Sequence, residues 1–221
     1  MEAIVLLGPP GSGKGTAAGI LEETMDFRHI STGELFRESM RDGSEIGTEI
    51  RPYMEEGQLV PDGLVLHVIE DVLKVRHLEE QVLFDGFPRT LIQAEAFESL
   101  LEKTQSTLTQ VFLLEAREEL LIARMGGRLV CSSCGTIFNM TSIPPNQSGH
   151  CDTCGASLAQ REDDIRGTIR QRLKIYRGCT APLADYYTIQ GLLRRVDADA
   201  SPSNTVGQIL ACLDDQGKRR D

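Results

Sequence analysis

The chain has 221 residues, 40% of them hydrophobic, which is enough for one globular core that carries small insertions. Its formal net charge is −10, from 33 acidic and 23 basic residues. The mean field of such a chain repels nucleic acid and anionic membranes, so the composition argues against general binding to either. No stretch reaches the roughly 18 apolar residues of a membrane span, and the apolar run at the N-terminus is too short for a signal peptide. We therefore expect a cytoplasmic protein.

Apolar runs that alternate with helical patterns organise most of the chain. We expect strands at residues 3–7, 82–84, 109–114 and 193–196, and helices that include 13–25, 62–77 and 91–101. Strands alternating with helices predict an α/β fold with a central parallel sheet, whose ligands bind at the carboxyl ends of the strands. Residues 129–160 break the pattern and predict a small, separately folded insertion. The polar tail, 214–221, is expected to fray.

A glycine-rich loop, residues 8–16 with the sequence GPPGSGKGT, follows the first predicted strand and opens a helix. Its glycines let several backbone N–H groups turn toward one phosphate, and the N-terminus of the helix adds a favourable field. Lys14 can supply positive charge to the outer phosphates, and Thr16 can hydrogen-bond a phosphate or lie near Mg²⁺. The pattern predicts a nucleotide phosphate site. An ordinary glycine-rich turn is the alternative, which the lysine and the threonine disfavour.

Three further segments place polar residues near predicted strands and helices: 29–37 (HISTGELFR), 58–62 (QLVPD) and 85–90 (DGFPRT). Gly86 permits the close approach of a ligand. Gln93 follows Arg89 by one helical turn, and its amide can both donate and accept, which suits an adenine edge. Each segment also has a structural alternative, because the serine of the first can cap a helix together with Glu34, and the Asp-Gly pair of the third can form a turn. Their combination in this order favours a binding site.

Four of the six cysteines form two Cys-x-x-Cys-Gly patterns. Four thiolates can form a closed tetrahedral Zn²⁺ site that leaves no open position, so a structural metal is predicted rather than a catalytic one. Two disulfides are the alternative, which a reducing compartment disfavours. The expected ligands are Cys131, Cys134, Cys151 and Cys154. Cys179 and Cys212 have no partner by spacing and are expected to be buried packing residues.

Together these motifs resemble the adenylate kinases of the nucleoside monophosphate kinase family, in their long-lid, zinc-binding bacterial type. In GKGT the hydroxyl residue comes one place later than is usual in GTPases and motor ATPases, and DGFPRT is the most diagnostic motif. The resemblance covers essentially the whole chain and implies a P-loop three-layer fold with a central parallel sheet. The core would comprise residues 1–30, 61–126 and 165–221, the AMP-binding insertion 31–60, and the zinc lid 127–164.

The resemblance also implies roles for the residues that match the family's motifs. ATP would be bound by Gly11, Ser12, Gly13, Lys14, Gly15, Thr16, Arg124, Arg128, Ile137, Phe138 and Ser201. AMP would be bound by Thr32, Arg37, Gln58, Leu59, Val60, Gly86, Phe87, Pro88, Arg89, Gln93, Arg161 and Arg172. The catalytic groups would be Lys14, Arg89, Arg128, Arg161, Arg172 and Asp85. Asp85 would orient Mg²⁺ through water, and Asp163 and Asp164 would organise the lid arginines, although acids also favour the start of a helix.

The implied reaction is reversible phosphoryl transfer, MgATP + AMP ⇌ 2 ADP, with catalytic Mg²⁺ and structural Zn²⁺ as cofactors. The implied partners are ATP, AMP and ADP, without nucleic acid or membrane, and the implied state is a monomer. One alternative is another acceptor (UMP, CMP or GMP), against which Thr32, Gln93 and the long lid argue. A second is a zinc ribbon for nucleic acid. Residues 131–154 contain no Lys or Arg, however, and so lack the basic face that such binding requires.

Overall fold

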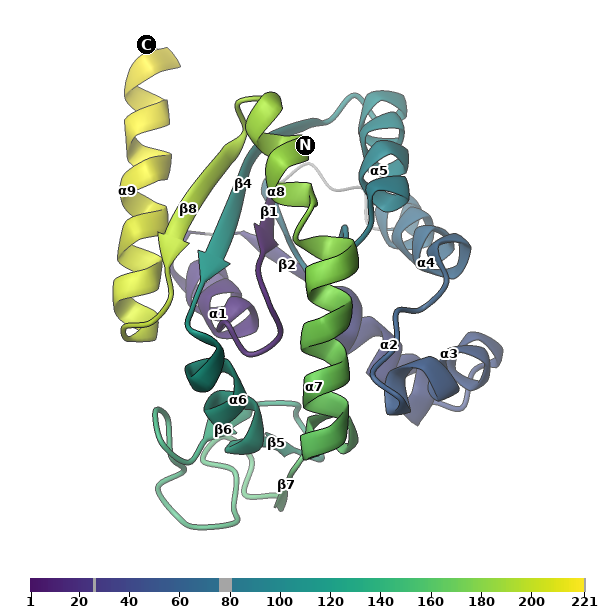
Figure 1. The fold of residues 1–221 in the computed structure, drawn as a ribbon, viewed down its shortest axis with the longest axis vertical. Helices are drawn as coiled ribbons and strands as arrows, with labels where there is room; N and C mark the ends of the chain where they lie inside the picture. Colours follow the sequence, from purple (N-terminus) through teal and green to yellow (C-terminus); the bar gives the residue numbers. More distant parts are fainter. Residues whose placement is uncertain (26, 76–80, 221) are drawn as a thin grey trace.

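The computed structural model describes residues 1–25, 27–75 and 81–220 and is shown in Figure 1. Within these ranges the chain forms a five-stranded sheet whose neighbouring strands are all parallel. The strands are β1 (Glu2–Leu7), β2 (Arg28–Ser31), β3 (Gln81–Asp85), β4 (Thr107–Glu115) and β8 (Leu193–Asp197). Their order in the sheet is β2-β3-β1-β4-β8. The predicted α/β fold with a central parallel sheet is therefore confirmed.

Helices cover both faces of this sheet and complete a three-layer core. They are α1 (Lys14–Met25), α4 (Asp62–Val75), α5 (Leu91–Lys103), α8 (Leu183–Ile189) and α9 (Pro202–Arg220). Buried side chains of α4, α5 and α8 join one core cluster, and those of α1 and α9 join another on the opposite face. β1 lies between the two clusters and contributes apolar side chains to both, since Ala3, Val5 and Leu7 face one cluster and Ile4 and Leu6 the other. From Ala3 to Leu7 no residue is more than 3% exposed, as expected of a central parallel strand.

Residues 31–60 form a pair of helices, α2 (Thr32–Arg41) and α3 (Glu45–Glu55). Both begin at serine N-caps whose side chains accept a backbone hydrogen bond. The helices approach each other closely at Gly47, where an added Cβ would lie 2.0 Å from the Ser39 carbonyl oxygen. A larger residue at this position would force the two helices apart, so the glycine sets their distance. Figure 1 shows the pair on the side of the sheet away from α9.

The cysteine-rich segment folds as its own small antiparallel sheet. The elements here are α6 (Glu118–Gly126), β5 (Arg128–Cys131), β6 (Ile137–Asn139), β7 (Leu158–Ala159), a 3-10 turn η1 (Glu162–Asp164), α7 (Arg166–Ile175) and a π-helical turn η2 (Tyr176–Thr180). The strands pair in the order β6-β5-β7. Their apolar cluster is small and centres on Cys131, Phe138 and Cys151. Figure 1 shows this sheet beyond the carboxyl ends of β4 and β8, where ligands of parallel sheets bind.

The ends of two helices differ from the sequence prediction. Helix α9 is described to Arg220, so the polar tail that we expected to fray from Asp214 onward is helical in this structure. No proline interrupts this stretch, which lets the helix continue. Asp221 and the predicted helix end at His77 lie outside the described residues, and α4 is described to Val75. Among the described helices, none is both long and apolar enough to cross a bilayer.

The two cysteines without a partner differ in their burial. Cys179 is exposed, which corrects the expectation that it packs in the core, and Cys212 is only partly buried. The reason is the π-helical turn η2, which places Thr180 inward at 8% exposure and leaves the neighbouring cysteine at the surface.

Candidate active site

A large cavity, of about 1010 Å³, lies at the carboxyl end of the parallel sheet. Its walls come from the glycine-rich loop (8–16), from the helical insertion (31–60) and from the cysteine-rich segment with its flanks. The volume is at the upper end of the range for small-molecule sites. Segments that are far apart in the sequence therefore converge on one site.

The glycine-rich loop forms one wall of the cavity and needs its glycines for steric reasons. Gly8 and Gly11 have φ values of +146° and +84°, and a Cβ at either would lie under 3 Å from a backbone carbonyl oxygen. Lys14 at the start of α1 donates from Nζ to the carbonyl oxygens of Gly8 (2.8 Å) and Pro9 (3.0 Å). Burial lowers the pKa of Lys14 to about 8, although Asp85 opposes the shift.

Asp85 ends β3 and faces the loop across the cavity. Burial raises the pKa of Asp85, but the neighbouring His29 ring and the charges of Lys14 and Arg89 outweigh it and lower that pKa below its usual value. The Nε2 atom of His29 lies 3.8 Å from Asp85 Oδ2. The carboxylate therefore stays ionised at neutral pH and can hold a hydrated divalent cation.

Arg89 is anchored at its side chain and at both ends of its own backbone. Its Nε donates to the Gly86 carbonyl oxygen (2.7 Å). Its N–H donates to Gln93 Oε1 (2.8 Å), and its carbonyl oxygen accepts from the Thr180 hydroxyl (2.8 Å). Gln93 is in turn fixed by Asp62, whose Oδ1 accepts from Gln93 Nε2 at 2.7 Å. These three contacts of Arg89 restrain its backbone on both sides and its guanidinium at Nε.

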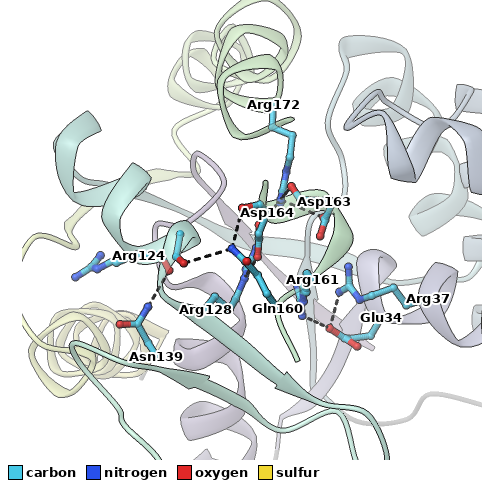
Figure 2. Close-up of polar contacts among 11 residues, drawn as sticks. Glu34, Arg37, Arg124, Arg128, Asn139, Gln160, Arg161, Asp163, Asp164 and Arg172 are labelled. Atoms are coloured by element: carbon cyan, nitrogen blue, oxygen red, sulfur yellow. Dashed lines mark hydrogen bonds and ion pairs between the residues drawn. The ribbon is translucent and has the colours of Figure 1, made fainter. Parts of the chain in front are cut away.

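Asp164 is the centre of an arginine cluster at the lid side of the cavity (Figure 2). Its side chain is fully buried and accepts from Arg128 Nε and Nη2, both at 2.6 Å, and from Arg172 Nη1 at 2.7 Å. Asp163 Oδ2 lies 3.0 Å from the same Nη1 of Arg172. One carboxylate thus joins β5, η1 and α7. Charge-assisted pairs of this length are among the strong hydrogen bonds of proteins.

Glu34 joins the helical insertion to the lid side of the cavity, a contact that the sequence analysis did not identify. Its Oε1 accepts from Arg37 Nη2 at 2.5 Å and from Arg161 Nη2 at 2.8 Å (Figure 2). Burial raises the pKa of Glu34, but the two arginines outweigh burial and lower it. Burial lowers the pKa of Arg161 to about 9, so Arg161 still carries its charge at neutral pH. The sequence indicated only a capping role for Glu34.

The far end of the cavity has backbone carbonyls and apolar side chains suited to a base. Arg124 Nη1 donates to the Ala198 carbonyl oxygen (2.7 Å), and its Nη2 donates to that of Ala200 (3.1 Å). Asn139 Nδ2 donates to the carbonyl oxygen of Arg124 at 2.8 Å (Figure 2). Ile137 lies nearby in the cavity wall. Arg124 therefore ties α6 to the loop between β8 and α9.

The four expected metal ligands meet at one point outside the main core. Their sulfur atoms all lie within 4.8 Å of one another, and none forms a disulfide. A tetrahedral Zn²⁺ with Zn–S bonds of about 2.3 Å holds its sulfurs about 3.8 Å apart, which this spread accommodates. The backbone N–H groups of Ser133 and Cys134 donate to Cys131 Sγ at 3.4 Å. The residues thus fit a four-thiolate metal centre.

Most of the residues expected from the sequence line the cavity, and the rest lie behind its wall. The lining members are Gly11, Ser12, Gly13, Lys14, Gly15, Thr16, Arg37, Gln58, Leu59, Asp85, Gly86, Pro88, Arg89, Arg124, Arg128, Ile137, Phe138, Arg161, Arg172 and Ser201. The members behind the wall are Thr32, Val60, Phe87 and Gln93, each at most 5% exposed. Glu34, His29 and Thr180 also line the cavity. The first two belong to the segment 29–37, in which the sequence assigned them no ligand contact, and Thr180 has no local sequence signal.

Comparison with known proteins agrees with this geometry. The family model described as adenylate kinase matches residues 6–192. The adenylate kinase of Thermotoga neapolitana is 41% identical over 214 residues, which cover 96% of this chain and 97% of that relative. The adenylate kinase of Caldicellulosiruptor bescii is 40% identical over 210 residues (95% and 98%), and that of Clostridium botulinum is 39% identical over 210 residues (95% and 97%). The chain therefore belongs to the adenylate kinase family.

Proposed function

We propose that this protein catalyses reversible phosphoryl transfer between adenine nucleotides, MgATP + AMP ⇌ 2 ADP. The observation that carries the proposal is the arrangement of the cavity, with a phosphate-binding loop on one wall, a second anion site around Arg37 on the opposite wall, and partly buried arginines between them. Membership of the adenylate kinase family supports it. Two nucleotides can meet there with their phosphates toward each other.

The proposed division of the chain follows the walls of the cavity. The core would comprise 1–30, 61–126 and 165–221, and would bind the ATP phosphates through residues 11–16. The insertion 31–60 would bind AMP, with Arg37 at the phosphate and the backbone of Gln58 and Leu59 at the base. The lid, 127–164, would close over ATP, with Ile137 and Phe138 at the adenine. Arg124 and Ser201 would complete that end. Support comes from the position of these residues in the cavity wall.

The four residues behind the wall would shape the AMP site from a second layer. Thr32 donates from its hydroxyl to the Gly86 carbonyl oxygen at 2.9 Å, and Gln93 holds the backbone of Arg89. Val60 and Phe87 pack in the core beside them. Direct contact of these four residues with AMP stays a prediction.

In the proposed reaction an oxygen of the AMP α-phosphate attacks the γ-phosphorus of ATP, and the bond from that phosphorus to the β-phosphate oxygen breaks. The attacking oxygen is already ionised, so no general base is needed, and catalysis rests on positioning and charge neutralisation. Lys14, Arg89, Arg128, Arg161 and Arg172 would stabilise the charge on the migrating group. Mg²⁺, held through water by Asp85, would neutralise charge on the phosphate oxygens of ATP. Lid closure would exclude water as a competing acceptor.

The test of this function is ADP formation from ATP with each of AMP, UMP, CMP and GMP under identical conditions. AMP is expected to give the highest kcat/KM. A higher kcat/KM with UMP, CMP or GMP would show that this nucleotide, and not AMP, is the preferred acceptor. The absence of ADP formation with all four would overturn the proposal.

We also propose that the cysteine centre holds Zn²⁺ and stabilises the lid, whose own apolar cluster is small. Cys151→Ser is expected to lose the metal and to lower the midpoint of thermal unfolding by about 5 °C or more. Zinc content by mass spectrometry and unfolding by calorimetry would measure both. Cys179→Ser is the matched control, because Cys179 is exposed and outside the cluster. A purified chain with no metal and the same stability after Cys151→Ser would contradict the proposal.

The buried lysine predicts a pH dependence of ATP binding. The pKa of Lys14 is lowered to about 8, so Lys14 is charged at pH 7 and largely neutral at pH 9. Bound phosphates require the charged form, so the Kd for ATP is expected to rise by about tenfold between these two pH values. Calorimetric titration at pH 7 and pH 9 would measure it. Lys14→Met, which cannot titrate, is expected to bind ATP weakly at both pH values, and an equal rise in that variant would assign the effect to another group.

The protein is further proposed to act as a monomer in the cytoplasm, with ATP, AMP and ADP as its partners and without nucleic acid or membrane. The acidic net charge of −10 supports the last point, because it disfavours polyanionic surfaces. Light scattering of the purified chain would measure the oligomeric state.

A further inference from the structure

The π-helical turn η2 interrupts the regular helix between α7 and α8 at the wall of the cavity. The N–H of Ala181 donates to the carbonyl oxygen of Tyr176 at 2.8 Å, five residues back in the chain. Single π-helical turns of this kind recur at functional sites because they redirect side chains. Here the turn places Tyr176 and Thr180 in the cavity wall, directly after the helix that carries Arg172.

Thr180 is the residue of this turn that contacts Arg89. It is 8% exposed, and its hydroxyl donates to the carbonyl oxygen of Arg89 at 2.8 Å. The two residues are 91 positions apart in the chain. On the N-terminal side of Arg89, its backbone N–H donates to Gln93 Oε1 at 2.8 Å. Gln93 Nε2 in turn donates to Asp62 Oδ1 at 2.7 Å. The backbone of Arg89 is thus held between α5 and η2.

We propose that Thr180 is a positioning residue for Arg89, which it holds in register with Arg172 for binding the AMP phosphate; this rests on the function proposed above. The physical reason is that the peptide plane after Arg89 can tilt more freely when its carbonyl oxygen has lost the hydroxyl donor. The backbone of Arg89 then shifts, and its guanidinium moves with it. A displacement of about 1 Å at a reacting group can cost about a hundredfold in rate. η2 continues directly from α7, the helix that carries Arg172. The hydrogen bond from the Thr180 hydroxyl therefore links the backbone of Arg89 to the same helical segment as Arg172.

The test is Thr180→Val, which keeps the shape of the side chain and removes its donor. The KM for AMP is expected to rise about tenfold, with a parallel rise in the Kd for AMP in calorimetric titration, while the KM for ATP stays within about twofold. Thr180→Ser, which restores the hydroxyl, is expected to return the KM for AMP to within about threefold of the wild-type value. Thr180→Ala serves as a second variant without the donor if the valine variant folds poorly.

Thr188→Val is the matched control. The Thr188 hydroxyl also donates to a carbonyl oxygen, that of Ala184 at 2.6 Å, but it is exposed on α8 and does not line the cavity. This variant is expected to keep wild-type values for both nucleotides. A Thr180→Val enzyme with an unchanged KM for AMP would overturn the positioning role, and so would equal losses for AMP and ATP with a lower thermal midpoint. If the wild-type protein formed no ADP from ATP and AMP, the proposed function itself would fail.

Discussion

Lys14→Met is expected to lower the turnover number in ADP formation by at least about a hundredfold. Lys14 is the cation of the glycine-rich loop, which we propose binds the ATP phosphates, and its Nζ donates to the carbonyl oxygens of Gly8 and Pro9. Removing one electrostatic contact to a transition state typically costs a factor of about 10² to 10³. A coupled assay at saturating ATP and AMP would measure the loss. Arg89→Ala is expected to have an effect of the same size, since the proposed reaction places Arg89 against the same migrating group.

The control for this prediction is a lysine that lies outside the cavity. Lys74 on α4 pairs with Glu70 at 3.4 Å, and its side chain is 67% exposed. Lys74→Met therefore removes the same charge without touching the site and is expected to keep wild-type turnover. Thermal unfolding of each variant would separate a folding defect from a catalytic one. Near-normal turnover in folded Lys14→Met would contradict the role assigned to the loop lysine.

Asp164→Ala is expected to lower the free energy of unfolding by about 3 kcal/mol, and turnover by at least about tenfold. The side chain of Asp164 is fully buried and holds both Arg128 and Arg172, so its loss removes the carboxylate that pairs with Arg128 and leaves Arg172 with that of Asp163 alone. Removing one partner of a buried ion pair costs about 3–5 kcal/mol, and the lower end applies because both arginines also face the cavity. Urea unfolding would measure stability, and the coupled assay would measure turnover.

The control for Asp164→Ala is an ion pair of the same type at the surface. Glu118 on α6 pairs with Arg177 on η2, and their side chains are 50% and 58% exposed. Glu118→Ala is expected to cost less than about 1 kcal/mol, since exposed pairs gain little from their charge. Equal losses in the two variants would show that burial does not decide the strength of the Asp164 cluster.

Much of the fold could be predicted from local patterns. The apolar run of β1 predicts a buried parallel strand, and the structure has one there. The glycine-rich loop after it predicts a phosphate site, and the loop lines the cavity. The two Cys-x-x-Cys pairs predict a four-thiolate centre, and their sulfurs do meet. Such signals depend on residues close together in the chain, or on a spacing that only one kind of site uses.

Other features follow from packing and have no local signal. Glu34 at the start of α2 looks like a helix-capping residue, yet it contacts Arg161, 127 positions away. Gln93 has an amide suited to a base edge, yet the structure turns its Oε1 to the Arg89 backbone and its Nε2 to Asp62. Cys179 is a free cysteine, a residue type that is usually buried, yet the π-helical turn leaves it exposed. In each case the outcome depends on which elements meet, not on the residue type.

The amino-acid sequence by itself determined the layered parallel fold, the phosphate loop and the cysteine centre, because each arises from periodicity or spacing within a short segment. Only the tertiary structure decided how the arginines are held, with Asp164 joining Arg128 to Arg172 and Thr180 reaching Arg89. The physical reason is one of range. Hydrogen bonds act within about 3 Å, and whether two distant side chains come that close depends on the packing of whole helices and strands.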